Sequence, residues 1–453
     1  MMNDLLIIGG GPAGYVAAER AGKAGLNVVL FEKNAMGGVC LNEGCIPTKT
    51  LLYSAKVYEN ALNSDKYGVF VDNADFQLDK VVSRKKKVVR KLVLGVDSKM
   101  KKNNVEVVRG EAYIEKKTEE GITVRCNDQR YLGKNLLICT GSESFIPNIP
   151  GLEIGENILT SREILDLKEK PESLVIIGGG VIGIEFASFF NSIGTKVTVV
   201  EMLPEILRGM DSELSAMLRG IYEKKGVEFH LSSRVTSVEG SKVMFEKDNQ
   251  AFEVDGDKVL VCVGRRPIVK NIGLENINME LEKNGIKVDQ KMRTSVPNVF
   301  AAGDVTGFSL LAHTASREGE VVVNNLTGNN DVMRYNAIPS VVYTSPELSG
   351  VGETEESAKQ KGLEYKVAKL PLAYSGRFVA ENEGGTGVCK VLVGSKYGEV
   401  IGVHILGSPS SEMIFGAAMA IEQELTLNEL REVVFPHPTV SEILKEVAFV
   451  FED

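Results

Sequence analysis

Several features that mark common classes of protein are missing from the sequence. No apolar run approaches the ~20 residues that span a bilayer, and the first residues carry neither a basic segment nor a small-residue cleavage site. The net charge of −9 argues against a nucleic-acid partner. We therefore expect a cytoplasmic protein that binds neither membranes nor nucleic acid.

Histidine and cysteine are also scarce. The four histidines include no His-x₃-His pair and the six cysteines no C-x-x-C pair, so no metal site is predicted. Six scattered cysteines in 453 residues do not form a disulfide framework. Cys139 and Cys262 lie in apolar, strand-like runs and are expected in the core. Only Cys40 and Cys45 lie close together in the chain.

The spacing of Cys40 and Cys45 is awkward for a disulfide. On a regular helix their Cα atoms would lie roughly 8–9 Å apart, whereas a disulfide requires about 4.4–6.8 Å. Gly44 and Pro47 supply the means to distort the backbone between and after them. Three interpretations stay open at this point: a strained redox pair, two buried structural cysteines, or half of a metal site.

The first 33 residues predict a strand, a glycine turn, a helix and a second strand. The apolar run 5–8 is followed by Gly9, Gly11 and Gly14 in a G-x-G-x-x-G pattern, and the second strand ends at Glu32. In this motif the glycines permit the turn, the approach of a pyrophosphate and close helix–strand packing, and the acid binds a ribose. The segment predicts a dinucleotide site.

The same unit recurs at residues 174–201. Gly178, Gly180 and Gly183 follow a second apolar run, and Glu201 ends the next strand. This carboxylate favours NAD over NADP, because it would repel a 2′-phosphate. The sequence thus predicts an α/β protein with two Rossmann-like, three-layer dinucleotide-binding domains.

The rest of the chain connects and follows these two units. Asp304 follows a strand at 299–303, so we interpret it as a ligand contact rather than as the cap of the helix expected over 312–326. From residue 336, antiparallel strands near 340–343, 364–370, 387–393 and 400–406, with helices over 411–423 and 439–449, predict an α+β domain without a nucleotide motif. The expected domains are 1–148, 149–270, 271–335 (a return to the first) and 336–453.

Two further segments allow two interpretations each. Glu442 stands three residues after Thr439, which suits a helix-capping box, but it could equally orient a charged His437. The basic run 84–102 has apolar residues at helical spacing. We interpret that run as the solvated face of a helix, with a docking patch as the less favoured alternative.

Five segments together resemble the pyridine nucleotide–disulfide oxidoreductase family over essentially the whole chain. They are the cysteine segment 37–49, Ala302-Gly303-Asp304, Leu311-Ala312-His313, Tyr343-Thr344-x-Pro346-Glu347 and His437-Pro438-Thr439-x-Ser441-Glu442. The resemblance implies FAD at the first site, NAD at the second and a homodimer formed through the C-terminal domain. It also implies that His437 works in the active site of the other subunit.

The resemblance implies specific roles for individual residues. The expected catalytic set is Cys40, Cys45, Lys49, Glu185, His437 and Glu442, with Cys40 facing the substrate and Cys45 the flavin. The expected FAD contacts are Gly9, Gly11, Pro12, Ala13, Gly14, Glu32, Lys33, Gly38, Val39, Cys40, Lys49, Ala112, Thr140, Gly141, Asp304, Leu311, Ala312 and His313. The expected NAD contacts are Gly178, Gly180, Val181, Ile182, Gly183, Glu201, Val235, Val263 and Gly264.

The implied activity is oxidation of dihydrolipoyl groups, with hydride transfer to NAD⁺. Because no lipoyl domain precedes the first motif, the lipoyl group is expected on a separate carrier protein. That carrier would belong to a 2-oxoacid dehydrogenase, an acetoin dehydrogenase or a glycine cleavage system. Two alternatives are a related enzyme for another small disulfide, and a flavoprotein scaffold without turnover.

Overall fold

The first dinucleotide unit forms the N-terminal sheet of the computed structural model, which describes residues 2–282 and 285–451. β1 (Met2–Ile8) pairs in parallel with β2 (Val28–Glu32) and with β6 (Gln129–Ile138), and α1 (Pro12–Lys23) connects β1 to β2. The strand order is β3-β2-β1-β6-β5-β4, and β19 pairs with β6. The remaining strands are β3 (Glu106–Arg109), β4 (Ala112–Thr118), β5 (Gly121–Cys126) and β19 (Val299–Ala301).

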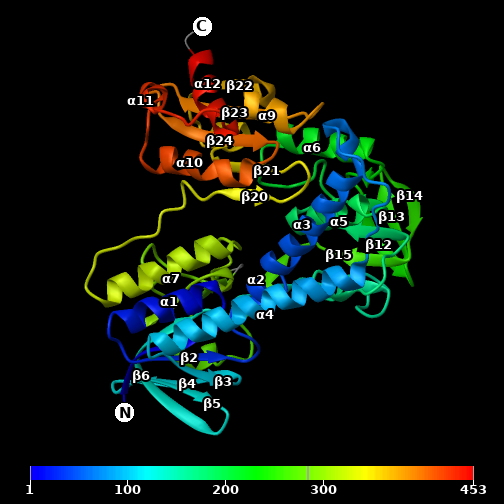
Figure 1. The fold of residues 1–453 in the computed structure, drawn as a ribbon. Helices are drawn as coiled ribbons and strands as arrows, with labels where there is room; N and C mark the ends of the chain where they lie inside the picture. Colours follow the sequence, from blue (N-terminus) through cyan, green and yellow to red (C-terminus); the bar gives the residue numbers. More distant parts are fainter. Residues whose placement is uncertain (1, 283–284, 452–453) are drawn as a thin grey trace.

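Both faces of this sheet are covered, which explains the continuous apolar run in β1. Leu5 and Ile7 join a core with α1, while Leu6 and Ile8 join a second core on the opposite face. α7 (Ala312–Leu326) lies beside α1 (Figure 1). A strand buried on both faces has no polar alternation. The helix expected over 312–326 is present as α7. β19 pairs with β6, so it brings residue 304 back to the first sheet.

The second unit forms a separate sheet of five strands in the order β11-β10-β9-β15-β8. Its pairs are parallel, and a three-stranded sheet, β12-β13-β14, accompanies it. The strands are β8 (Ile158–Thr160), β9 (Ser173–Ile177), β10 (Lys196–Val200), β11 (Glu228–His230), β12 (Arg234–Glu239), β13 (Lys242–Lys247), β14 (Gln250–Asp255) and β15 (Lys258–Val261); the helices are α5 (Val181–Ser192) and α6 (Ser212–Lys224).

Two short antiparallel strands, β7 (Ser142–Ser144) and β16 (Arg265–Pro267), pair where the chain enters and leaves the second unit. Three helices accompany the first unit: the short α2 (Gly38–Asn42) and the long α3 (Cys45–Leu62) and α4 (Leu78–Lys102). None of the described helices is long and apolar enough to cross a membrane.

The C-terminal residues form a five-stranded antiparallel sheet in the order β20-β21-β24-β23-β22. Its elements are β20 (Ser340–Val342), β21 (Leu348–Gly352), β22 (Tyr365–Pro371), β23 (Val388–Gly394), β24 (Val400–Leu406), α8 (Glu355–Gln360), α9 (Gly376–Glu381), α10 (Ser410–Glu422), α11 (Leu427–Glu432) and α12 (Ile443–Val450). β21 escaped sequence prediction because it contains two glycines. A Cβ at one of them, Gly350, would lie 2.6 Å from Nδ1 of His404. The helix expected from 439 begins at Ile443, after a 3₁₀ turn.

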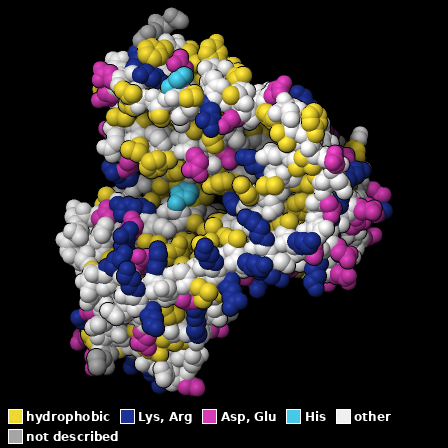
Figure 2. Space-filling view, viewed as in Figure 1, with side chains coloured by type: hydrophobic (Ala, Val, Ile, Leu, Met, Phe, Trp, Pro, Cys, Tyr) yellow, Lys and Arg dark blue, Asp and Glu magenta, His cyan; other side chains and the backbone are white. Residues whose placement is uncertain are grey.

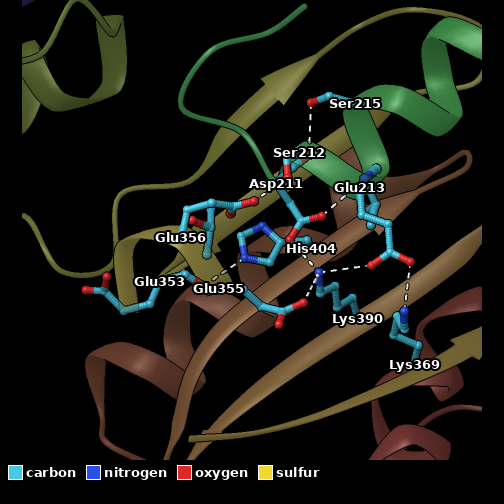
Figure 3. Close-up of polar contacts among 12 residues, drawn as sticks. Asp211, Ser212, Glu213, Ser215, Glu353, Glu355, Glu356, Lys369, Lys390 and His404 are labelled. Atoms are coloured by element: carbon cyan, nitrogen blue, oxygen red, sulfur yellow. Dashed lines mark hydrogen bonds and ion pairs between the residues drawn. The ribbon is translucent and has the colours of Figure 1, made fainter. Parts of the chain in front are cut away.

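Lys390, on β23, lies at a polar joint between the C-terminal sheet and the start of α6 (Figure 3). Its Nζ lies 2.8 Å from Asp211, 3.1 Å from Glu213 and 2.7 Å from Glu355. Its side chain is only 2% exposed, so the charge is compensated by carboxylates rather than by water. The joint therefore ties the second dinucleotide unit to the C-terminal sheet.

The basic run lies on α4, a helix as expected, but the prediction that the run is solvated is wrong for one residue, Lys85. Lys85 is buried, not solvated: its Nζ donates to the carbonyl of Leu165 at 2.8 Å and lies 3.0 Å from Asp166. Its position in the helix faces the 3₁₀ turn that holds Leu165, Glu163–Asp166. A run of five adjacent polar and basic residues must wrap around a helix, so one of them faces inward.

Candidate active site

One large cavity, of about 1930 Å³, connects the two glycine loops with the cysteine pair. It is hollowed into the face seen in Figure 2, between the N-terminal and C-terminal sheets. It is lined by almost all of the residues expected to bind cofactors, and also by Cys45 and Glu185. Four of the expected site residues do not line it: Gly14, Gly183, His437 and Glu442.

Gly14 and Gly183 have a packing role that explains their absence from the cavity wall. A Cβ at Gly14 would lie 1.9 Å from the carbonyl oxygen of Gly9, and one at Gly183 would lie 2.1 Å from that of Gly178. Gly9 and Gly178 have φ angles of +106° and +107°, a region that only glycine enters readily. The two loops are therefore built in the same way.

The space above the middle glycines fits a dinucleotide phosphate group. A Cβ at Gly180 would meet nothing within 4 Å, and one at Gly11 only the Cα of Gly38, at 3.9 Å. Each of these glycines directly precedes a helix, α1 or α5, whose first N–H groups are unpaired donors. The residues present thus suit a dinucleotide at each loop.

Glu32 and Glu201, the two acids expected to bind ribose, make equivalent backbone contacts in their two loops. Glu32 accepts hydrogen bonds from the backbone N–H of Gly10 and Asn34, both at 2.7 Å. Glu201 accepts from Gly179 at 2.5 Å and from Leu203 at 2.7 Å. A carboxylate offers about four acceptor positions, so each acid keeps capacity for ribose hydroxyls while it orders its own loop.

The cysteine segment is bent between its two cysteines. α2 ends at Asn42 and α3 begins at Cys45, and Gly44 between them has φ −145° and ψ −107°, outside the helical and extended regions. This break brings the two thiols into hydrogen-bonding contact. The distortion predicted at Gly44 is therefore present, and the structure shows all six cysteines as free thiols.

The two thiols differ in acidity. A hydrogen bond from Cys40 is the main cause that lowers the pKa of Cys45 to about 7, and the charge of Lys49 acts in the same direction. The same contact, with burial, raises the pKa of Cys40. Cys45 is also the first residue of the 18-residue α3, where the helix dipole favours a thiolate. Of the two thiols, Cys45 is therefore the one that loses its proton more readily.

Lys49 and Glu185, both expected in the catalytic set, form an ion pair. The Nζ of Lys49 lies 2.8 Å from both carboxylate oxygens of Glu185, whose side chain is 4% exposed. The backbone N–H of Tyr343 donates to Glu185 at 3.1 Å, and the Tyr343 ring lies 4.4 Å from Nζ. The lysine ammonium is thus held at the cavity wall one helical turn after Cys45.

Asp304 does not cap α7: it begins a separate 3₁₀ turn, lines the cavity and accepts a hydrogen bond from Ser142 at 2.5 Å. Arg265 donates to the Ser142 hydroxyl at 2.8 Å and to its carbonyl at 2.7 Å. Burial raises the pKa of Asp304, whereas Ser142 and Arg265 oppose that shift. Sequence reasoning missed Ser142 and Arg265.

His437 and Glu442 lie outside the cavity of their own chain. Nδ1 of His437 lies 2.8 Å from Oε1 of Glu442, and Oε2 accepts from the backbone N–H of Thr439 at 2.8 Å. Glu442 therefore makes the contacts that both interpretations require, one with each oxygen. His437 is 81% exposed, so its other nitrogen is open to a molecule outside this chain.

Comparisons with known proteins agree over the full chain. Residues 3–319 match the family described as pyridine nucleotide-disulphide oxidoreductase, and residues 338–448 match its dimerisation domain. Dihydrolipoyl dehydrogenase of Geobacillus stearothermophilus is 40% identical over 452 residues, covering 99% of this chain and 96% of the relative. The human mitochondrial dihydrolipoyl dehydrogenase is 38% identical, covering 98% and 89%.

Solved structures of other proteins also resemble this chain over nearly its whole length. The HOCl-induced flavoprotein disulfide reductase RclA of Escherichia coli superposes with a TM-score of 0.87 at 30% identity, covering 99% of both chains. LpdA of Mycobacterium tuberculosis superposes with a TM-score of 0.90 at 25% identity, also covering 99% of both. The chain belongs to the pyridine nucleotide–disulfide oxidoreductase family.

Proposed function

We propose that this protein is an NAD-dependent dihydrolipoyl dehydrogenase that uses FAD. The observation that carries the proposal is the placement of the Cys40–Cys45 pair in one cavity with two dinucleotide loops. The 36–40% identity to dihydrolipoyl dehydrogenases over nearly the whole chain supports this substrate rather than another disulfide. NAD is favoured over NADP because the buried carboxylate of Glu201 would repel a 2′-phosphate.

The proposed reaction starts with Cys40 and Cys45 joined in a disulfide. A substrate thiolate attacks the sulfur of Cys40, the Cys40–Cys45 bond breaks, and Cys45 leaves as a thiolate. A pKa near 7 makes Cys45 a good leaving group. The second substrate thiolate then attacks the substrate sulfur of the mixed disulfide and releases Cys40 as a thiolate, which takes up a proton because its pKa is raised. The substrate leaves as a disulfide, oxidised by two electrons.

FAD, when bound at the first loop, would accept this electron pair from Cys45 and supply it to NAD⁺ as a hydride. The net products are NADH, the lipoyl disulfide and one proton. The positive charge of Lys49, held by Glu185, would stabilise negative charge that develops beside the cysteine pair. Ser142 and Arg265 would keep Asp304 oriented toward the FAD site.

The proton acceptor in this proposal is His437. Nδ1–H of the imidazole donates to Glu442, which leaves Nε2 free to take a proton from the substrate thiol. His437 is exposed and outside its own cavity, while residues 338–448 match a dimerisation domain. We therefore propose a homodimer in which His437 completes the site of the other subunit.

Further parts of the proposal come from the sequence. The lipoyl group would be carried by a separate protein of a 2-oxoacid dehydrogenase, acetoin dehydrogenase or glycine cleavage system, and the compartment would be the cytoplasm. The proposed domain boundaries are 1–148 and 271–335 for FAD, 149–270 for NAD and 336–453 for the dimer interface. The residue roles assigned above belong to the same proposal.

The test is NADH formation from NAD⁺ and dihydrolipoamide by the purified, yellow protein. We expect turnover with wild type, none with Cys45→Ser, and normal turnover with Cys126→Ser, a buried cysteine outside the cavity. Reduced glutathione replaces dihydrolipoamide, and NADP⁺ replaces NAD⁺, as the competing substrates. Preference for either, or full lipoamide turnover by Cys45→Ser, would refute the proposal.

A further inference from the structure

The exposed face of α4 concentrates positive charge on an acidic protein. The helix carries ten Lys and Arg residues against two Asp residues, whereas the whole chain has a net charge of −9. Figure 2 shows Lys and Arg side chains gathered in a band over α4, beside the hollow of the cavity. This asymmetry is not explained by the catalytic mechanism.

The cations form a continuous surface that the fold does not neutralise. Lys80, Arg84, Lys87 and Lys91 follow one another at spacings of four, three and four residues, so they share a side of the helix, with Arg90 next to them. Like charges four residues apart destabilise a helix by roughly 0.2–0.5 kcal/mol per pair. We call these five exposed residues the α4 basic face.

Other cations of α4 behave differently. Lys85 and Lys86 pair with Asp166, and Lys99 pairs with Glu19. Among the described residues, by contrast, Lys87, Arg90 and Lys91 form no ion pair. Within residues 2–282 and 285–451, no ion pair of Lys87, Arg90 or Lys91 therefore offsets the repulsion along this face, although acidic residues are abundant elsewhere.

The α4 basic face lies alongside the cysteine helix. Arg84 donates to the backbone carbonyl of Thr50 at 3.2 Å, and its guanidinium lies 5.9 Å from the Tyr53 ring. Thr50 is five residues after Cys45 on α3, a rise of about 7–8 Å along a helix. A molecule bound to this face is thus close to the redox pair.

We propose that the α4 basic face docks an acidic protein that carries the dithiol substrate. The proposal rests on the proposed function. Lys and Arg would pair with surface carboxylates, and the local field would steer the carrier toward the cavity. The partially exposed Leu92 and Leu94 lie within the same stretch and offer apolar contact. A protein suits this face better than a long polyanion, because the acidic remainder of the chain would repel a polymer that extends beyond α4.

The probe is a set of three synthetic peptides of equal length, each with a central dihydrolipoyl-lysine. The flanking residues are Glu in the first, Gln in the second and Lys in the third. At low salt we expect kcat/KM to fall in that order, with the acidic peptide roughly tenfold above the neutral one. High salt should remove the difference, because exposed charges are screened.

The variant is Lys87→Glu/Arg90→Glu/Lys91→Glu. It should lose the preference for the acidic peptide or reverse it, and keep wild-type turnover of free dihydrolipoamide. The matched control is Lys116→Glu/Lys168→Glu/Lys270→Glu, which makes the same change of charge at exposed sites on other elements. The control should retain most of the preference.

The outcomes separate this inference from the proposed function. If wild type fails to oxidise free dihydrolipoamide, the proposed function itself fails. If wild type oxidises it but treats acidic and neutral peptides alike, or if the two triple variants lose the preference equally, the docking surface is wrong. Binding of the same face to single-stranded DNA or anionic vesicles, with no peptide preference, would also overturn it.

Discussion

Lys49 and Glu185 meet in a two-oxygen ion pair, although 136 positions separate them in the chain. The pair connects α3, which begins with Cys45, to α5, which follows directly on the second dinucleotide loop. The ion pair therefore joins the first dinucleotide unit to the second. The lysine is also held over the ring of Tyr343, which directly follows β20, so the C-terminal sheet contributes as well.

The acidity of Cys45 should depend on Cys40 first and Lys49 second. In the reduced enzyme, alkylation by iodoacetamide should rise with pH with a midpoint near 7, because only the thiolate reacts. Cys40→Ala removes the hydrogen bond and should move the midpoint upward, as should Lys49→Met to a smaller extent. Cys40→Ser keeps a donor, and its midpoint should stay close to wild type. Equal midpoints for Cys40→Ala and Cys40→Ser would contradict this assignment.

Glu442→Gln should impair catalysis more than folding. The amide cannot accept with both of its atoms, so the variant loses either the contact with His437 or that with Thr439. We expect kcat/KM for dihydrolipoamide to fall about 10–100-fold, within the range of general-base effects. Thr439→Ala, which keeps the His437 contact, is the control. A fall in Tm without a fall in kcat/KM would assign Glu442 to the helix end alone.

Two glycines of the second loop should respond in opposite ways to alanine. Gly180→Ala places a methyl group in open space, so Tm should be unchanged. The KM for NAD⁺ should rise, because the methyl group would occupy the space that fits the dinucleotide phosphate. Gly183→Ala places it 2.1 Å from a backbone oxygen, so the free energy of unfolding should fall by about 1–3 kcal/mol, as for overpacked sites. Thermal unfolding and NAD⁺ kinetics distinguish these results. A loss of stability in Gly180→Ala would show that the protein itself fills the space next to Gly180.

Lys390→Met should be strongly destabilising. It leaves Asp211, whose side chain is 1% exposed, without its cation. Breaking a buried pair in this way typically costs about 3–5 kcal/mol, measurable by urea unfolding. The double variant Asp211→Asn/Lys390→Met should recover part of that loss. A double variant as unstable as the single one would mean that packing, not charge, governs the joint.

Local patterns predicted much of the molecule. The two βαβ units follow from glycines, apolar runs and acids within about 25 residues, because each unit's geometry is local. The bend at Gly44 followed from a comparison of helix and disulfide geometry. The family, fold class and activity depended on several such segments occurring in order.

Contacts between distant segments were harder to predict. The Arg265–Ser142–Asp304 chain depends on the pairing of β7 with β16, and no periodicity reveals that pairing. Lys85 looked like its basic neighbours, because the element that buries it lies some 80 positions away. β21 was hidden by two glycines, one of which, Gly350, leaves the space that the neighbouring His404 occupies. In each case the missing information was which elements become neighbours.

Glu201 also constrains attempts to change the nucleotide that this protein uses. The obvious route to NADP is to replace the acid with a neutral or basic residue. Its carboxylate, however, also accepts the N–H groups of Gly179 and Leu203, and an unpaired buried N–H costs about 1–3 kcal/mol. A single substitution would therefore loosen the loop that it aims to retune. Redesign of nucleotide preference must transplant the whole segment from Gly178 to Leu207 as a unit.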